Sequence, residues 1–255
     1  MTRIILLGAS NLTNGFPLVV SLLRGGLAGP LDVLAAHGHG RSYGRWSRVF
    51  HRALPGISRC GLWDDFAARP AAGPTFALLT DVGNDLMYGA PVSTIVEWVA
   101  SCLDRLAARD ARITLTLLPL ASLEQLSAWR YHAAHRILFP KRRPPVWTEM
   151  RARALDLAER FGALGERYAA QTVTPAGEWY GLDPIHIRRS LRPQVWRQIL
   201  SQWPGFNASA TLDRLTWRRA RALRRCRPLL RRVFSREQTT PQPVWRSGEL
   251  TLSMY

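Results

Sequence analysis

Lysine is nearly absent from this sequence of 255 residues. Lys141 is the only lysine, so 34 of the 35 basic residues are arginine, and with 18 acidic residues the formal net charge is +17. An arginine bias this strong, together with abundant alanine, is also what a GC-rich genome produces. The net charge by itself therefore does not assign a nucleic acid or a membrane as the partner.

Cysteine is also scarce. Cys60, Cys102 and Cys226 are an odd number, lie far apart and form no CxxC pair. This usage argues against a disulfide framework and favours reduced thiols in a reducing compartment. The first apolar run begins at residue 3, with no basic segment or small-residue cleavage site before it, so we expect no signal peptide. Both features predict a cytoplasmic location.

Long apolar runs are missing as well. No run reaches the roughly 18 residues that cross a bilayer, and arginine, glycine and proline interrupt even residues 21–36. Hydrophobic residues make up 47% of the chain, which is enough for a substantial core. With no internal repeat, the length fits one α/β domain with extensions or two small domains.

The apolar residues gather in short runs of strand length. Four runs lie at residues 4–7, 31–35, 76–80 and 113–118, and a weaker one lies in the sequence AQTVT at residues 170–174. Residues 92–110, 148–169 and 192–203 have helical periodicity. Strands that alternate with helices are typical of βαβ units and a parallel sheet. The predicted fold class is therefore α/β.

A domain boundary is predicted at Pro204-Gly205, directly after the last of these helical segments. We expect a main domain over residues 1–205 and an arginine-rich helical extension over residues 206–255. The extension is predicted to contain a basic helix from about residue 211 to residue 227. The sequence VWRSGELTL predicts a terminal hairpin that turns at Ser247-Gly248.

Polar residues follow the apolar runs, at the edge where a parallel sheet presents the carboxyl ends of its strands and binds its ligands. Ser10 and Asn11 follow the first run. The sequences AHGHGRSYG, TDVGNDLMYG and GLDPIHI follow the second, third and last runs. A serine, a glycine-rich turn, an asparagine and an Asp-x-x-His pair are therefore expected at one edge.

These groups suffice for acyl transfer. A serine hydroxyl needs a base to take its proton, and a histidine oriented by a carboxylate is the usual base. Asp183 and His186 stand three residues apart on a turn stiffened by Pro184, close enough for the carboxylate to hold the ring. Backbone N–H groups at Ser10 and in the glycine turn, with an asparagine amide, are candidate donors to the oxyanion; losing one such donor slows catalysis by about 10²- to 10³-fold.

In this order and spacing the four blocks resemble those of the SGNH hydrolases, also called GDSL-type esterases and lipases, over residues 3–203. The resemblance implies a flavodoxin-like three-layer α/β/α sandwich with a mostly parallel central sheet, ester hydrolysis and no cofactor. By position it implies the following roles: Ser10 as nucleophile, His186 as base, Asp183 as its partner, and an oxyanion hole of the Ser10 and Gly40 N–H groups and the Asn84 amide. Acyl transfer to an acceptor other than water is a related outcome that the sequence leaves open.

Three residues depart from the family pattern. Ala9 stands where the first block usually has an aspartate, so the task of that carboxylate falls to another group or is left undone. Val82 replaces a common glycine, and His39 stands beside Gly40 where the family often has a small or aliphatic residue. Taken alone, Ser10 is also a preferred helix N-cap.

Two further features have alternative interpretations. A metal site could use two aspartates and three histidines: Asp81, Asp85, His37, His39 and His186. A binuclear phosphoesterase needs an early Asp-x-His and a Gly-Asn-His-Asp, and neither is present, so no metal is expected. Trp129, Tyr131 and Phe139 follow the fourth apolar run, either to wall the substrate cleft or simply to pack.

The arginine-rich segment over residues 211–236 has three interpretations. It is a solvated helix docked on its own domain, a helix that lies on anionic lipid, or a nucleic-acid-binding element. No recognised reading motif accompanies the charge, so nucleic acid binding is not expected. The sequence thus predicts a serine-dependent acyl hydrolase acting on a small-molecule or lipid ester. The alternative is an inactive domain of the same fold whose tail binds anionic membrane or nucleic acid.

Overall fold

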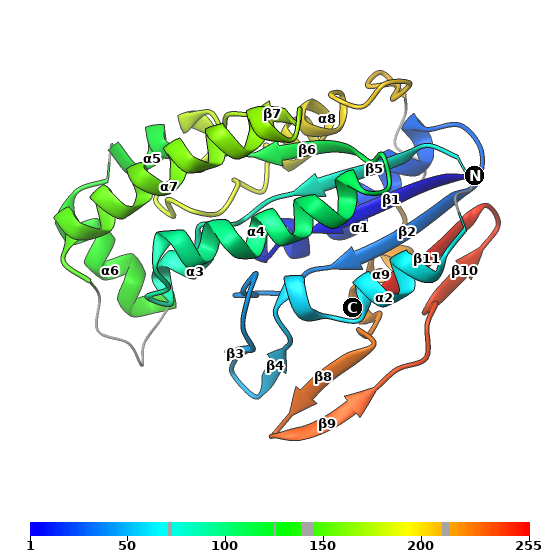
Figure 1. Ribbon diagram of the computed structural model, residues 1–255, viewed down its shortest axis with the longest axis horizontal. Helices are drawn as coiled ribbons and strands as arrows, with labels where there is room; N and C mark the ends of the chain where they lie inside the picture. Colours follow the sequence, from blue (N-terminus) through cyan, green and yellow to red (C-terminus); the bar gives the residue numbers. More distant parts are fainter. Residues whose placement is uncertain (71–72, 125, 139–144, 211–214) are drawn as a thin grey trace.

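The computed structural model describes residues 1–70, 73–124, 126–138, 145–210 and 215–255. Its centre is a seven-stranded sheet in the order β10-β11-β2-β1-β5-β6-β7 (Figure 1), parallel except for the antiparallel pair β10 and β11. The strand bounds are β1 Thr2–Leu7, β2 Leu31–Ala36, β5 Thr75–Leu79, β6 Arg112–Thr116, β7 Gln171–Val173, β10 Trp245–Ser247 and β11 Leu250–Met254. The predicted α/β class is confirmed, and β2-β1-β5-β6-β7 reproduces the flavodoxin-like strand order.

Helices cover both faces of this sheet, as Figure 1 shows. One face packs against α1 (Ser10–Gly26) and α8 (Arg192–Leu200). The other packs against α2 (Leu62–Ala68), α4 (Val92–Ala107) and α7 (Trp147–Arg167). The structure is therefore the three-layer α/β/α sandwich that the resemblance implies.

Strand β1 explains why the sheet has two cores. Ile4 and Leu6 point into the cluster beneath α1 and α8, and Ile5 and Leu7 point into the cluster beneath α4 and α7. All four side chains are fully buried, which is why the sequence shows a continuous apolar run and no alternation. The carboxyl end of β1, just before Ser10, is therefore packed on both sides.

Helices α1 and α8 pack closely through a glycine. Gly15 of α1 lies against the indole of Trp196, and a Cβ atom added at Gly15 would collide with the ring nitrogen. Trp196 is fully buried. This contact fixes α1, the helix that begins at the candidate nucleophile.

The chain after residue 205 supplies strands to two sheets. Strand β11 pairs in parallel with β2, and β10 folds back on it through a two-residue loop at Gly248 and Glu249. Strands β8 (Leu230–Val233) and β9 (Arg236–Thr239) join β3 (Ser47–Val49) and β4 (Arg52–Leu54) in a four-stranded sheet, at the bottom of Figure 1. The stretch predicted as an extension thus shares both sheets with residues 1–205.

Within that stretch, the basic helix α9 spans Trp217–Arg225. It is shorter than the helix predicted over residues 211–227, and residues 211–214 lie outside the described part of the chain. The Thr216 hydroxyl accepts the Arg219 N–H at 3.2 Å and so caps the helix. Leu223 is buried in the core beneath α1, while Trp217 is 69% exposed.

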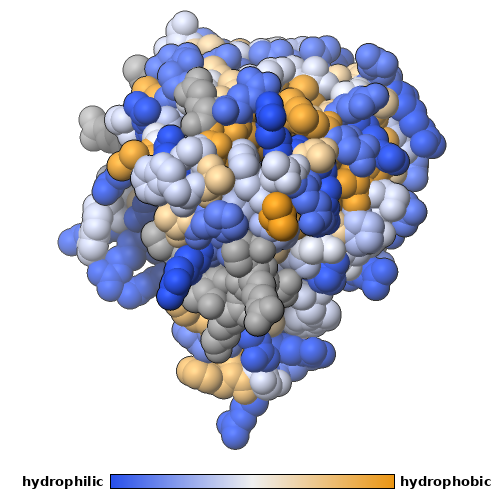
Figure 2. Space-filling view, turned by 90° about the vertical axis from the view of Figure 1, so that its left-hand side faces the viewer, coloured by the Kyte–Doolittle hydropathy of each residue, from blue (hydrophilic) through white to orange (hydrophobic). Residues whose placement is uncertain are grey.

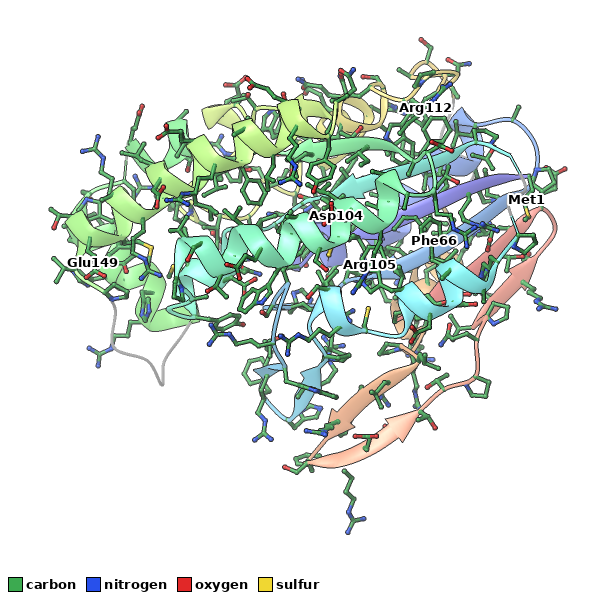
Figure 3. The ribbon with its side chains drawn as sticks, in the orientation of Figure 1. Met1, Phe66, Asp104, Arg105, Arg112 and Glu149 are labelled. Carbon is green, nitrogen blue, oxygen red and sulfur yellow. The ribbon has the colours of Figure 1, made fainter. Side chains whose placement is uncertain are left out.

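Three short helices gather at the carboxyl ends of the strands: α3 (Asn84–Met87), α5 (Leu120–Glu124) and α6 (Ala128–Leu138). In Figure 3, Met1 and Arg112 mark the opposite end, where strands begin, and Glu149 at the start of α7 marks this one. Two one-turn 3₁₀ helices, Ile57–Arg59 and Gly177–Trp179, complete the elements. In the described part of the chain no helix combines the length and apolar content needed to span a membrane.

Candidate active site

Ser10 is the first residue of α1 and lies just beyond the end of β1. Gly8 permits this sharp turn, because a Cβ atom at Gly8 would lie 2.6 Å from Cγ2 of Thr80. The N-cap position belongs to Ala9, and no N-cap side chain bonds to the helix. The interpretation of Ser10 as the helix cap is therefore wrong, and its side chain is free for another contact.

The Ser10 hydroxyl bonds to His186, a residue 176 positions away in the sequence. Ser10 Oγ lies 2.8 Å from His186 Nε2, and His186 Nδ1 lies 2.6 Å from Asp183 Oδ2. A carboxylate only accepts hydrogen bonds, so Nδ1 carries the ring proton and Nε2 accepts the proton of Ser10. The three residues thus form a continuous line of hydrogen bonds.

The Asp183 carboxylate is held in its charged form. Partial burial acts to raise the pKa of Asp183, but the hydrogen bond and charge of His186 outweigh it and lower the pKa below its ordinary value. Asp183 Oδ1 also accepts the N–H groups of Ile185 at 3.1 Å and His186 at 3.2 Å. One carboxylate therefore orients the ring and stabilises the tight DPIH turn.

Asn84 presents a buried amide to the cavity beside Ser10. It is the first residue of α3, which follows β5, and it lines the cavity that Ser10 also lines. Its Nδ2 is buried and has no hydrogen-bond partner among the described residues. Buried polar groups are nearly always bonded, so this unpaired amide is an unusual feature of the cavity and a candidate donor to a ligand.

Gly40 lies on the loop after β2, outside the lining of that cavity. Its φ of +60° is one that glycine adopts readily, and the Tyr88 hydroxyl donates to its carbonyl oxygen at 2.5 Å. Asp85 accepts Ser42 Oγ–H at 2.5 Å and Tyr43 N–H at 2.7 Å, which ties the same loop to the turn carrying Asn84. The two predicted oxyanion donors thus belong to segments that are bonded to each other.

Asp81 is the residue whose contacts the sequence did not reveal. Its Oδ2 accepts the N–H groups of Ala9 at 2.9 Å, Asn11 at 3.0 Å and Leu12 at 3.2 Å. Over residues 1–70 and the other described segments, the Ser10 N–H makes no hydrogen bond. Asp81 therefore occupies the donors on both sides of Ser10 and leaves that of Ser10 open. In the sequence, Ala9 was the sign that another group could hold this turn, because the family pattern has a carboxylate at that position.

The cavity beside Ser10 is mainly apolar and has a volume of about 130 Å³. Its walls include side chains from the start of α1, from the segments that follow β5 and β6, and from α5, α6 and α7, among them Leu118, Leu123, Leu126, Met150 and Ala154. Figure 2 views the molecule from this end and shows apolar residues among polar ones on the surface. The site thus places the Ser10 hydroxyl beside an apolar cavity large enough for a small group.

The three aromatic residues that could wall the substrate cleft differ in their positions. Tyr131 lines the cavity and is 4% exposed, and its hydroxyl has no partner among the residues that the structure describes. Trp129 is 72% exposed and is not part of the lining. Phe139 lies outside the described residues.

The other two departures from the family pattern also lie near the site. Val82 is buried and lines the cavity. Burial and the nearby Arg52 and His186 lower the pKa of His39, and Asp81 acts in the opposite direction. Among the described residues, no three histidine, cysteine, aspartate or glutamate side chains lie close enough together to hold a metal ion.

Comparisons with known proteins give similar structures at low identity. No family model and no curated protein matches the sequence. The chain is similar to a member of the lipolytic protein G-D-S-L family from Veillonella parvula, at 9% identity and a TM-score of 0.49, over 79% of this chain and 97% of that one. A carbohydrate acetylesterase family member from Sinorhizobium meliloti has 15% identity and a TM-score of 0.48, over 79% and 100%. The psychrotrophic esterase EstA from a Pseudoalteromonas species has 13% identity and a TM-score of 0.46, over 79% and 97%.

Proposed function

We propose that this protein is a serine-dependent hydrolase of carboxylic esters, of the SGNH type that its sequence resembles. The observation that carries the proposal is the line of contacts from Ser10 Oγ to His186 Nε2, at 2.8 Å, and from His186 Nδ1 to Asp183 Oδ2, at 2.6 Å. A hydroxyl, a base and a carboxylate in this geometry make an activated nucleophile.

Acylation of Ser10 is the first half of the reaction. His186 Nε2 takes the hydroxyl proton while Ser10 Oγ forms a bond to the ester carbonyl carbon. The carbonyl oxygen becomes an oxyanion, which the Asn84 amide and the N–H groups of Ser10 and Gly40 stabilise. His186 then returns the proton to the alkoxy oxygen, the C–O bond breaks, and the alcohol leaves.

Hydrolysis of the acyl-enzyme is the second half. His186 removes a proton from water, and the resulting hydroxide attacks the acyl carbon. The second oxyanion collapses, Ser10 Oγ leaves and takes the proton back from His186, and the carboxylic acid is released. Throughout, Asp183 keeps the ring in one tautomer and stabilises the imidazolium.

The cavity limits the group that accompanies the reacting carbon. A volume of about 130 Å³ is close to that of an engineered apolar cavity of about 150 Å³ that holds benzene. Its lining is largely aliphatic. We therefore expect short acyl groups of about four to six carbons to react faster than long ones.

Hydrolysis of p-nitrophenyl esters with acyl chains of increasing length tests the proposal. The wild type should hydrolyse them, with a maximum at short chains, and Ser10→Ala should lose nearly all activity. Ser101→Ala on α4 is the matched control, because Ser101 lies far from the cavity lining, and it should keep wild-type activity.

Two results would overturn the proposal. Activity that survives Ser10→Ala would come from another group. No activity on any ester, with salt-sensitive binding of the folded protein to anionic vesicles or DNA, would favour the inactive domain with a binding tail.

A further inference from the structure

We propose that Asp81 and Asn11 are a positioning pair that sets the distance between Ser10 and His186. Asp81 supplies from the end of β5 the carboxylate that the first block lacks at Ala9. This inference rests on the proposed function, since it concerns the nucleophile and base of that reaction.

The Asp81 carboxylate fixes the turn before α1 through hydrogen bonds. Its Oδ2 accepts three backbone N–H groups, from Ala9, Asn11 and Leu12, at 2.9 to 3.2 Å. A carboxylate at a helix N-terminus is stabilised by the unpaired N–H groups and the helix dipole. Ala9 is fully buried, and its methyl group offers no acceptor to this turn. Without Asp81, three donors around Ser10 would lose their partner.

The backbone of Asp81 supports a role beyond simple packing. Its φ is +62°, in the left-handed region that residues other than glycine rarely adopt. Such a conformation persists only where surrounding contacts fix it, and it concentrates at functional sites. The hydrogen bonds of the carboxylate are the contacts that hold Asp81 in this conformation.

Asn11 extends the hold to the loop that carries the base. Its Nδ2 donates to Asp81 Oδ1 at 2.8 Å and to the Ile185 carbonyl at 2.8 Å. Its Oδ1 accepts the Ile187 N–H at 2.9 Å. These three bonds leave one orientation for the amide. Asn11 therefore hydrogen-bonds to the residues immediately before and after His186.

The hydrogen bonds of Asp81 and of Asn11 together position Ser10 and His186. Asp81 fixes the turn in which Ser10 stands, and Asn11, the next residue, fixes the loop in which His186 stands. The distance of 2.8 Å between Ser10 Oγ and His186 Nε2 is thus set by two neighbours that also line the cavity. A displacement of about 1 Å between reacting groups costs about 10²-fold in rate.

Asp81→Asn tests the pair with little change of shape. The amide keeps one acceptor oxygen but places an NH2 group where the other carboxylate oxygen accepted a hydrogen bond, so it cannot make all four bonds of the carboxylate. We expect kcat to fall by about 10²-fold with KM changed less than about twofold, because positioning acts in the transition state. The rate at which a fluorophosphonate labels Ser10 should fall in parallel.

Restoring the carboxylate at its family position separates positioning from plain stability. Adding Ala9→Asp to Asp81→Asn should recover at least about tenfold of the lost rate. Asn11→Ala should mimic Asp81→Asn. Asp64→Asn, at an exposed aspartate of α2, is the matched control and should leave kcat unchanged.

The outcomes are distinguishable. If Asp81→Asn keeps wild-type kcat and labelling rate, or if its remaining activity only follows the fraction of protein that is folded by circular dichroism, the positioning role is wrong. If the wild type itself neither hydrolyses esters nor reacts with the fluorophosphonate, the proposed function is wrong.

Discussion

Asn84→Ala should lower activity without lowering stability. The buried Nδ2 of Asn84 has no partner in the described segments, so it contributes nothing to the folded state and costs about 1–3 kcal/mol of desolvation. In the reaction it would meet a developing negative charge. Removing one such donor raises the barrier by about 2.7–4 kcal/mol, a loss of about 10²- to 10³-fold in kcat.

The stability change follows from the same atom. Alanine removes the unpaired donor and is a better helix former than asparagine by a few tenths of a kcal/mol, which offsets the lost packing. A change of about 1 kcal/mol corresponds to about 2–4 °C in a protein of this size. We therefore expect the Tm of Asn84→Ala to equal that of the wild type or to exceed it by up to about this amount.

Steady-state kinetics and thermal unfolding of the same samples test this prediction. KM should stay within about twofold, because the donor acts in the transition state more than in the ground state. Asn84→Asp should be at least as slow as Asn84→Ala, since it presents an acceptor to the oxyanion. Asn14→Ala on α1, outside the cavity lining, should match the wild type. A raised KM with unchanged kcat, or a lowered Tm that accounts for the lost activity, would refute the reasoning.

Three further predictions concern other parts of the chain. Asp183→Asn should lower kcat by up to about 10⁴-fold, because an amide cannot hold the same ring tautomer; kcat near the wild-type value would contradict this role. Burial and the charges of Arg41, Arg52 and His39 lower the pKa of His37 from 6.5 to about 3, so the unfolded chain binds a proton between these pH values that the folded protein does not. Stability should therefore fall as pH drops below about 6.5, by at most about 1.4 kcal/mol per pH unit from this group, and His37→Gln should flatten that part of a Tm-versus-pH curve; equal slopes would contradict the assignment. If residues 211–236 bind membranes, sedimentation with phosphatidylglycerol vesicles should be lost on replacing the exposed Arg218 and Arg221 by glutamate, and wild-type sedimentation that survives both replacements would contradict that prediction.

The central strands could be predicted because their signal is local. Strands β1, β2 and β5 are buried on both faces, so each leaves a mainly apolar run, broken in β2 by Asp32, and their carboxyl ends fall within one residue of the predicted runs. The polar residues after them follow from the geometry of a parallel sheet. This is why Ser10 and His186, far apart in sequence, could be expected at one edge.

The four-stranded sheet of β3, β4, β8 and β9 leaves no such signal in the sequence. All four residues of β9 are exposed, and β3 and β4 have three residues each, too few for a hydrophobic period to be visible. The pairing of β11 with β2 depends on contacts between the two ends of the chain. The sequence predicted the hairpin at residue 248 but not the sheet edge that it joins.

The role of Asp81 could not be predicted from the sequence, for a different reason. Asp81 acts through a positive φ and through contacts with residues about 70 positions earlier, and neither leaves a periodic pattern. In the sequence it stood only among the residues of a metal interpretation that the missing metal motifs argued against. Only Ala9, where a carboxylate was expected, indicated that another residue performs that task.

In the proposed reaction Ser10 is a nucleophile activated by His186. Incubation with a fluorophosphonate, followed by intact mass and peptide mapping, probes this activation without any knowledge of the substrate. We expect one adduct per chain, located on Ser10, absent in Ser10→Ala and formed far more slowly in His186→Gln. A folded wild-type protein that forms no adduct, or one that is labelled at another residue, would contradict it.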